Sequence, residues 1–302
     1  MTSQRPRNVR LLTLEQLALT DAETFGEVVE ELSARSVVFE NHYLQTAGLT
    51  GILNGLHMVS ARQSHRGCAT FVLIDEDDRG LVNLPPFPPG WHTRSVHIPD
   101  AKSTFSDLRN VDFVWLHAHV GGAPEFAQCL AVMDALCSHS SVLIVTAVHG
   151  KAPNWNSLPF ESLLPEPLIR VPLWLTGSGL TTSSVQTLTG SDDIGLTISE
   201  LLNGRRQRES IDSASPVGPV NLIELAEFPG RPVLRNVCLR NADVVAVRSD
   251  DFLYVECDRA TEVPEPDRSS RALYAKPADV WNVHDVSGEY HAVVDELRRR
   301  LI

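Results

Sequence analysis

The stretch VLIVTAVHG, residues 142–150, is a run of aliphatic residues that ends in a histidine and a glycine. A continuous apolar run of this length indicates a strand covered on both faces, as in a parallel sheet between layers of helices. Ligands approach open α/β sheets at the carboxyl ends of their strands. The stretch therefore predicts a buried strand that carries His149 to the edge of a sheet where ligands bind.

Further apolar runs of strand length recur along the chain. They lie at residues 8–14, 68–74, 112–120 and 169–177. Helical patterns fall between them at residues 22–35, 125–137 and 193–204. Because alternating strands and helices build a sheet covered on both faces, this order predicts an α/β fold with a mostly parallel sheet flanked by helices.

The composition changes in the last third of the chain. Residues 205–220 are polar and rich in turn-forming residues, which is typical of a linker or loop. Beyond them, residues 243–257 have the pattern of a hairpin, and the final residues 288–302 have the apolar stripe of a helix. We expect an α/β domain at 1–204 and a small C-terminal α+β subdomain at 221–302.

Acidic residues outnumber basic ones by 38 to 26 in this chain of 302 residues, and the formal net charge is -12. Such a charge repels phosphate backbones and anionic lipids, which argues against nucleic acid as a partner. No uninterrupted apolar run approaches the roughly 20 residues of a membrane helix, and charges interrupt the first residues where an export signal would be apolar. We expect a cytoplasmic protein without a membrane partner.

Several segments, taken in order, match the motifs of one family. FENHY (39–43) and LNG (53–55) resemble Phe-x-Asn-x-Tyr and Leu-Thr-Gly, VLIVTAVHG resembles a strand ending Ser-Asp-His-Gly, and SDDIGLTISELLNG (191–204) resembles a helix written Asp-x-x-Pro-Thr-x-x-x-Leu-x-Gly. These are motifs of the sulfatase family of the alkaline phosphatase superfamily, and the resemblance spans nearly the whole chain. It implies an alkaline-phosphatase-like fold.

The resemblance also implies a site for ester hydrolysis, in which carboxylates hold a hard divalent cation. The chain departs from this pattern at two ligand positions. Glu15 stands where the family has the first-strand aspartate, and Val148 replaces the aspartate before His149. Glu15 and His149 are therefore the remnant metal positions. Two other interpretations stay open: Glu15 as an exposed charge at a helix start, and His149 as a hydrogen-bonding partner of the next loop.

The nucleophile motif is also altered, because no cysteine lies between Tyr43 and Gly55. Thr46 and Thr50 are the hydroxyl candidates in this segment, although an unactivated threonine is a poor nucleophile and both residues also suit turns or helix caps. His117 and His119 alternate along a strand and so point to the same side. This histidine pair is a candidate for ester contact or for a transition metal, or else a packed pair.

The residues thus predict a sulfatase-like protein that has lost its activity and has a binding or regulatory role, with no cofactor. Its expected partner is an unidentified protein or a small anionic ligand. The alternative is an active sulfuric or phosphoric ester hydrolase with an atypical site that uses a divalent cation such as calcium or magnesium. Asp192 and Asp193 are expected to be charges at a helix N-terminus.

Overall fold

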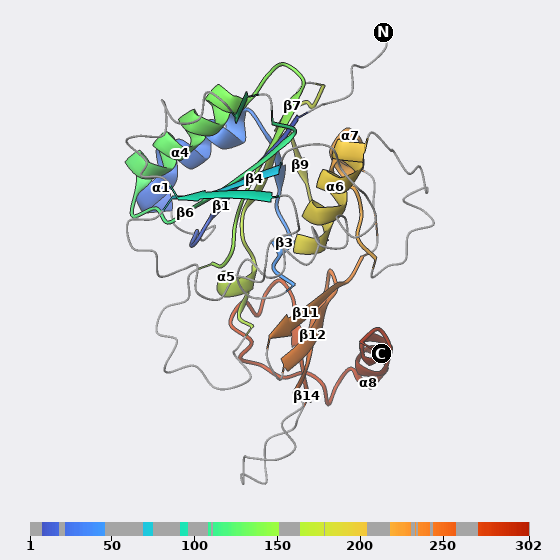
Figure 1. Ribbon diagram of the computed structural model, residues 1–302. Helices are drawn as coiled ribbons and strands as arrows, with labels where there is room; N and C mark the ends of the chain where they lie inside the picture. Colours follow the sequence, from blue (N-terminus) through green and yellow to red (C-terminus); the bar gives the residue numbers. More distant parts are fainter. Residues whose placement is uncertain are drawn as a thin grey trace.

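The computed structural model has a large mixed sheet with helices on both faces and a smaller antiparallel sheet beside it (Figure 1). It describes residues 8–17, 22–45, 69–74, 91–95, 108–109, 111–150, 164–177, 179–203, 218–230, 233, 235–241, 244–257 and 271–301. At residues 22–24, 69–74, 91–95, 203 and 241 it describes the backbone alone.

Within these residues the large sheet holds eight strands in the order β5-β4-β6-β1-β7-β8-β2-β9. Their bounds are β1 (Asn8–Leu14), β2 (Val37–Phe39), β4 (Ala69–Ile74), β5 (Trp91–Ser95), β6 (Phe113–Ala118), β7 (Ser141–Ala147), β8 (Leu173–Gly177) and β9 (Ser183–Val185). β8 runs antiparallel to its neighbours β7 and β2, and the other pairings are parallel. The α/β fold with a mostly parallel sheet is confirmed.

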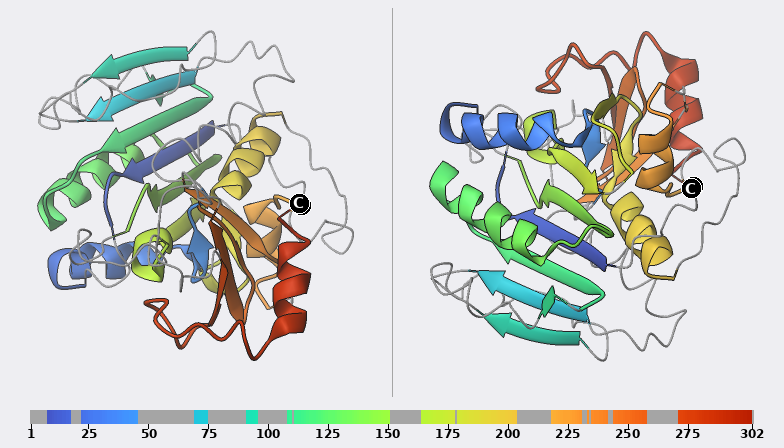
Figure 2. Two further views of the ribbon diagram at one scale, coloured as in Figure 1. Left: turned by 90° about the horizontal axis from the view of Figure 1, so that it is seen from below. Right: turned by 90° about the horizontal axis from the view of Figure 1, so that it is seen from above.

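Helices cover both faces of this sheet. Figure 2 shows α1 (Ala22–Ala34) and α4 (Ala123–Leu136) on one side, with α6 (Ser191–Asn203) and α7 (Leu222–Glu227) on the other. The alternating side chains of β1 supply both cores, because successive residues of a strand point to opposite faces. Leu12 and Leu14 join the cluster that includes α4, whereas Val9 and Leu11 join the cluster that includes α6.

The apolar run at 169–177, expected to be one strand, is divided in the structure. Its first residue ends the short helix α5 (Glu166–Ile169), and β8 begins at Leu173. Pro172 lies between the two elements. Proline has no N–H to donate to a sheet, which explains why the strand begins after it.

The smaller sheet contains, in the described ranges, the antiparallel strands β11 (Val237–Asn241), β12 (Val244–Arg248), β13 (Phe252–Cys257) and β14 (Arg271–Ala275). The hairpin expected at 243–257 corresponds to β12 and β13. The final helix α8 (His291–Arg298) packs on this sheet through the buried Leu297. Residues 204–217 lie outside the described part, and the division into two domains stays a prediction.

A buried polar cluster joins the two sheets. Glu166, at the start of α5, accepts hydrogen bonds through Oε1 from the Tyr43 hydroxyl at 3.0 Å and from Arg248 Nε at 3.1 Å. Tyr43 belongs to β3 (His42–Tyr43), which pairs with β10 (Thr189–Gly190) next to the large sheet, and Arg248 ends β12. Because Glu166 and Arg248 are both almost fully buried, this ion pair fixes the small sheet against the large one.

None of the helices in the described residues is long and apolar enough to span a membrane.

Candidate functional site at the strand ends

The central strands β6, β1 and β7 end side by side at one edge of the large sheet. Leu14 pairs with Ala118 on one neighbour and with Ala147 on the other. The pairing continues beyond the strands, because Glu15 N donates to Ala118 O at 2.9 Å and Val148 N donates to Leu14 O at 2.9 Å. The fold therefore brings Glu15, His119, Val148 and His149 to one edge, as expected for the carboxyl ends of parallel strands.

Glu15 is bound by a histidine from the neighbouring strand. His119 Nδ1 lies in hydrogen-bonding contact with Glu15 Oε2, and the two side chains are 60% and 42% exposed. Both residues follow the last residue of their strand, so the contact depends on the adjacency of β1 and β6. Glu15 is thus not an isolated surface charge, and within the described part of the chain it belongs to no cluster of metal-binding side chains.

Beneath this pair lies a buried hydrogen-bond chain across the same two strands. Trp115 Nε1 donates to Thr13 Oγ1 at 2.8 Å, and Thr13 Oγ1 lies 3.0 Å from His117 Nδ1. An indole N–H only donates, so Thr13 can use its own proton toward His117 Nδ1, which leaves the proton of the neutral ring on Nε2. His117 is 8% exposed and belongs to this chain, whereas His119 pairs with Glu15. The two histidines have different partners on β1.

The residues that follow β7 face different surroundings. Val148 is 3% exposed and packs in the apolar cluster that includes Ile144 and Ile194. His149 is partly buried, and its Nδ1 lies 3.0 Å from the carbonyl oxygen of Gly150. The position at which the resemblance expects a metal carboxylate is therefore an apolar core position.

Gly150 lies where the chain passes very close to α5. Its N–H donates to Leu168 O at 2.8 Å, and a Cβ at this position would lie 2.0 Å from Pro167 O. No side chain fits at that separation, so the glycine after His149 is required by close backbone approach.

The donor set does not fit the divalent cation that the resemblance implies. Calcium and magnesium need several oxygen ligands, and among the described residues that follow β6, β1 and β7 the carboxylate is that of Glu15, which is already bound by His119. Among the described residues, no group of three or more His, Cys, Asp or Glu side chains is arranged to hold a metal ion. Thr46 and Thr50 lie outside the described residues.

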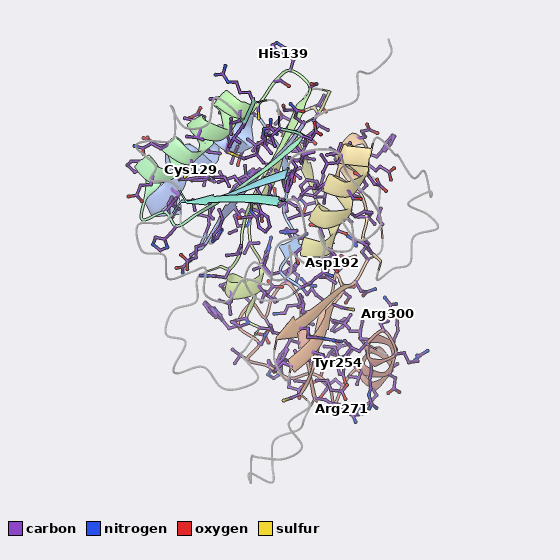
Figure 3. The ribbon with its side chains drawn as sticks, viewed as in Figure 1. Cys129, His139, Asp192, Tyr254, Arg271 and Arg300 are labelled. Atoms are coloured by element: carbon purple, nitrogen blue, oxygen red, sulfur yellow. The ribbon has the colours of Figure 1, made fainter. Side chains whose placement is uncertain are left out.

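The N-terminus of α6 has a polar centre that the sequence analysis identified in part. Asp193 Oδ2 accepts from Gly190 N at 2.8 Å, as expected of a charge at a helix start, but Asp193 also binds Arg235 Nη1 at 2.8 Å and Arg235 Nη2 at 3.1 Å. Burial, and then the neighbouring Asp193, raise the pKa of Asp192. Figure 3 shows Asp192 at the end of α6 nearest the small sheet. No motif in the sequence around Arg235 indicates that this residue binds Asp193.

Comparison with known proteins supports the fold. No protein-family model matches the chain, and no curated protein matches its sequence. An alkaline phosphatase superfamily protein from Vibrio parahaemolyticus has a TM-score of 0.68 at 11% identity, over 98% of this chain and 85% of that chain. A sulfatase of a glycosaminoglycan-metabolism locus of Bacteroides thetaiotaomicron has a TM-score of 0.66 at 13% identity, over 99% of both chains. A phosphonate monoester hydrolase from Silicibacter pomeroyi has a TM-score of 0.59 at 12% identity, over 97% of this chain and 94% of that chain.

Identities this low carry the fold and not the reaction, because one fold can hold many sites. The superposed structures cover almost all of this chain, including the small antiparallel sheet. The chain therefore has the alkaline-phosphatase-like fold of sulfatases and phosphonate monoester hydrolases.

Proposed function

We propose that the chain is a sulfatase-like protein that does not hydrolyse esters and that acts by binding at the carboxyl edge of β6, β1 and β7. The observation that carries this proposal is the burial of Val148 in the apolar core. A valine cannot bind a cation, and Val148 packs among apolar side chains of β7 and α6 such as Ile144 and Ile194.

The contact between Glu15 and His119 supports the same proposal. A carboxylate that accepts a hydrogen bond from a histidine has lost part of its capacity to bind a hard cation, because the N–H competes for the oxygen lone pairs. Ester hydrolysis in such a fold needs that cation to neutralise charge on the transferring group and to acidify the nucleophile. A binding role needs neither.

The ligand that best suits this edge is a small anion with hydrogen-bond acceptors. His119 and His149 follow the strands on either side of β1, and His119 contacts Glu15, so that the edge carries two histidines and one carboxylate. Imidazoles become donors at both nitrogens when protonated, which lets them hold an oxyanion, and the charge of Glu15 limits the affinity.

The catalytic half of the proposal is tested by metal analysis and by turnover. Protein purified without a metal-affinity step is analysed by mass spectrometry for calcium, magnesium, manganese and zinc, and assayed on chromogenic aryl sulfates and phosphates with each metal added. We expect no stoichiometric metal and no turnover above that of His149→Ala. Stoichiometric metal together with turnover that His149→Ala abolishes would instead establish the active hydrolase.

The binding half is tested with inorganic sulfate and phosphate. We expect each anion to raise the unfolding temperature, and to raise it further in Glu15→Gln, because that change removes a like charge beside the ligand. The control is Asp134→Asn, which removes a carboxylate that pairs with Arg35 on the outer helices. Equal anion responses in the two variants would exclude this edge as the binding site, and a protein partner would then be the remaining candidate.

A further inference from the structure

Arg235 is a buried arginine that uses four of its five N–H groups on described residues. Nη1 donates to Leu188 O and Asp193 Oδ2, both at 2.8 Å, and Nη2 donates to Asp193 Oδ1 at 3.1 Å and to Gly218 O at 2.7 Å. A guanidinium has five N–H groups. The fifth, on Nε, is buried and has no partner among the described residues.

His42 also has a buried ring nitrogen without a hydrogen-bond partner among the described residues. It is fully buried on β3, and its Nδ1 lies 3.1 Å from Thr189 Oγ1. Asn41 O, 3.5 Å from Thr189 Oγ1, is an acceptor to which Thr189 can direct its own proton, and with the proton there Thr189 Oγ1 accepts from His42 Nδ1–H. The neutral ring therefore carries its proton on Nδ1, which makes Nε2 an acceptor, and Nε2 is buried without a partner in the described chain.

The side chains of Arg235 and His42 lie in the same region of the molecule. Two consecutive residues contact them, because Arg235 binds Leu188 O while His42 binds Thr189 Oγ1. Burial, and then the charge of Arg235, lower the pKa of His42 to about 3, so the ring is neutral at ordinary pH. An unmet buried donor and an unmet buried acceptor are thus carried by two side chains that bind neighbouring residues, and leaving both unmet costs free energy.

We propose that one buried water molecule bridges the two side chains, accepting from Arg235 Nε–H and donating to His42 Nε2. A buried water requires two or more polar partners, and these two atoms provide one of each kind. Water suits the pair because it accepts and donates at the same oxygen. A metal cation does not suit it, because the guanidinium beside His42 would repel a second positive charge.

The bridge completes a hydrogen-bonded unit from three distant parts of the chain. It links β3, the N-terminus of α6 and the residue two positions before β11, and it does not depend on the proposed function. Gln45, two residues after β3, is tied to the same unit, since Gln45 N donates to Ser191 Oγ at 3.2 Å and Asp192 N donates to Gln45 Oε1 at 2.7 Å. The water thus stabilises the point from which the chain leaves β3.

The first test uses the wild-type chain labelled with ¹⁵N in histidine and arginine. NMR spectra should show His42 as the Nδ1–H tautomer, and Arg235 Hε should give a cross-relaxation peak to a long-lived water molecule. His42 as the Nε2–H tautomer would overturn the proposal. A hydrogen-bond coupling between Arg235 Nε and His42 Nε2 would also overturn it, because the two side chains would then bind directly.

Two conservative variants separate the roles of the histidine nitrogens. His42→Asn keeps a donor near the Nδ1 position and loses the acceptor, whereas His42→Gln keeps an acceptor near the Nε2 position. Relative to His42→Gln, we expect His42→Asn to accelerate solvent exchange of Arg235 Hε about fivefold, the factor for one net hydrogen bond. Equal exchange in both variants would contradict the bridge. His139→Asn is the control, because His139 is exposed at the far end of the molecule (Figure 3).

Discussion

Asp193 and Arg235 form a two-point ion pair inside the protein, with side chains 1% and 4% exposed. The carboxylate also accepts the backbone N–H groups of Gly190 and Val220, so all its contacts are hydrogen bonds to buried donors. Removing the charge of one member leaves the other buried without compensation. We expect Asp193→Asn to lower the free energy of unfolding by about 3–5 kcal/mol, measured by urea denaturation.

The matched control is Asp134→Asn on the surface of α4. Asp134 also makes two hydrogen bonds to an arginine, Arg35, but both side chains are about two-fifths exposed. Water screens such a pair, so the same substitution should cost about 1 kcal/mol or less. Similar losses at the two sites would show that burial does not determine the contribution of these ion pairs.

Gly150 and Gly26 provide a second matched pair, in which the same change should have opposite effects. Gly150→Ala places a methyl group against the Pro167 carbonyl and should destabilise the fold by about 1–3 kcal/mol. Gly26 lies inside α1 with nothing within 4 Å of the position that a Cβ would take, so Gly26→Ala should stabilise by about 0.5–1 kcal/mol. Urea denaturation of both variants checks the signs, and a neutral Gly150→Ala would refute the close approach.

Local patterns in the sequence predict the central strands and the main helices well. The run at 8–14 matches β1 residue for residue, and most of β7 lies in the stretch 142–150, because a strand buried on both faces is apolar throughout. These features depend on neighbours in the sequence.

Contacts between strands could not be predicted in the same way. The pairing of Glu15 with His119 depends on the adjacency of β1 and β6, and these strands are about a hundred residues apart. The partner of Asp193 lies 42 positions away in a segment without periodicity. The antiparallel direction of β8 likewise follows from the path of the chain and not from its local composition.

Val148→Asp tests whether this valine is the residue that removes the cation site. Leu14 pairs with Ala147, so the next positions, Glu15 and Val148, are neighbours at the strand ends. A second carboxylate here should destabilise the protein by about 3 kcal/mol, because it is buried beside a like charge. Calcium should then raise the unfolding temperature of Val148→Asp and leave the wild type and Val148→Asn unchanged. If calcium does not affect the variant, the loss of this one carboxylate does not explain the altered site.

Lys276 should make the stability of the protein depend on pH in the alkaline range. The residue is 6% exposed, its ammonium group donates to Asn282 Oδ1 at 2.7 Å, and burial lowers the pKa of that group to about 8. Between that value and the ordinary lysine pKa of about 10.4, the unfolded chain binds the proton that the folded chain has lost. The contribution of Lys276 to the free energy of unfolding must therefore increase as pH rises through this window.

The measurement compares urea denaturation of the wild type and Lys276→Met at several pH values from about 7.5 to 9.5. Cysteines such as Cys129, whose pKa burial raises to about 12, weaken the fold as pH rises, because their thiols ionise first in the unfolded chain. This opposing effect is common to both proteins and cancels in the difference. The free energy of unfolding of the wild type should rise relative to the variant as pH increases. A constant difference would mean that the Lys276 ammonium has an ordinary pKa in the folded protein, and that the contact with Asn282 compensates for its burial.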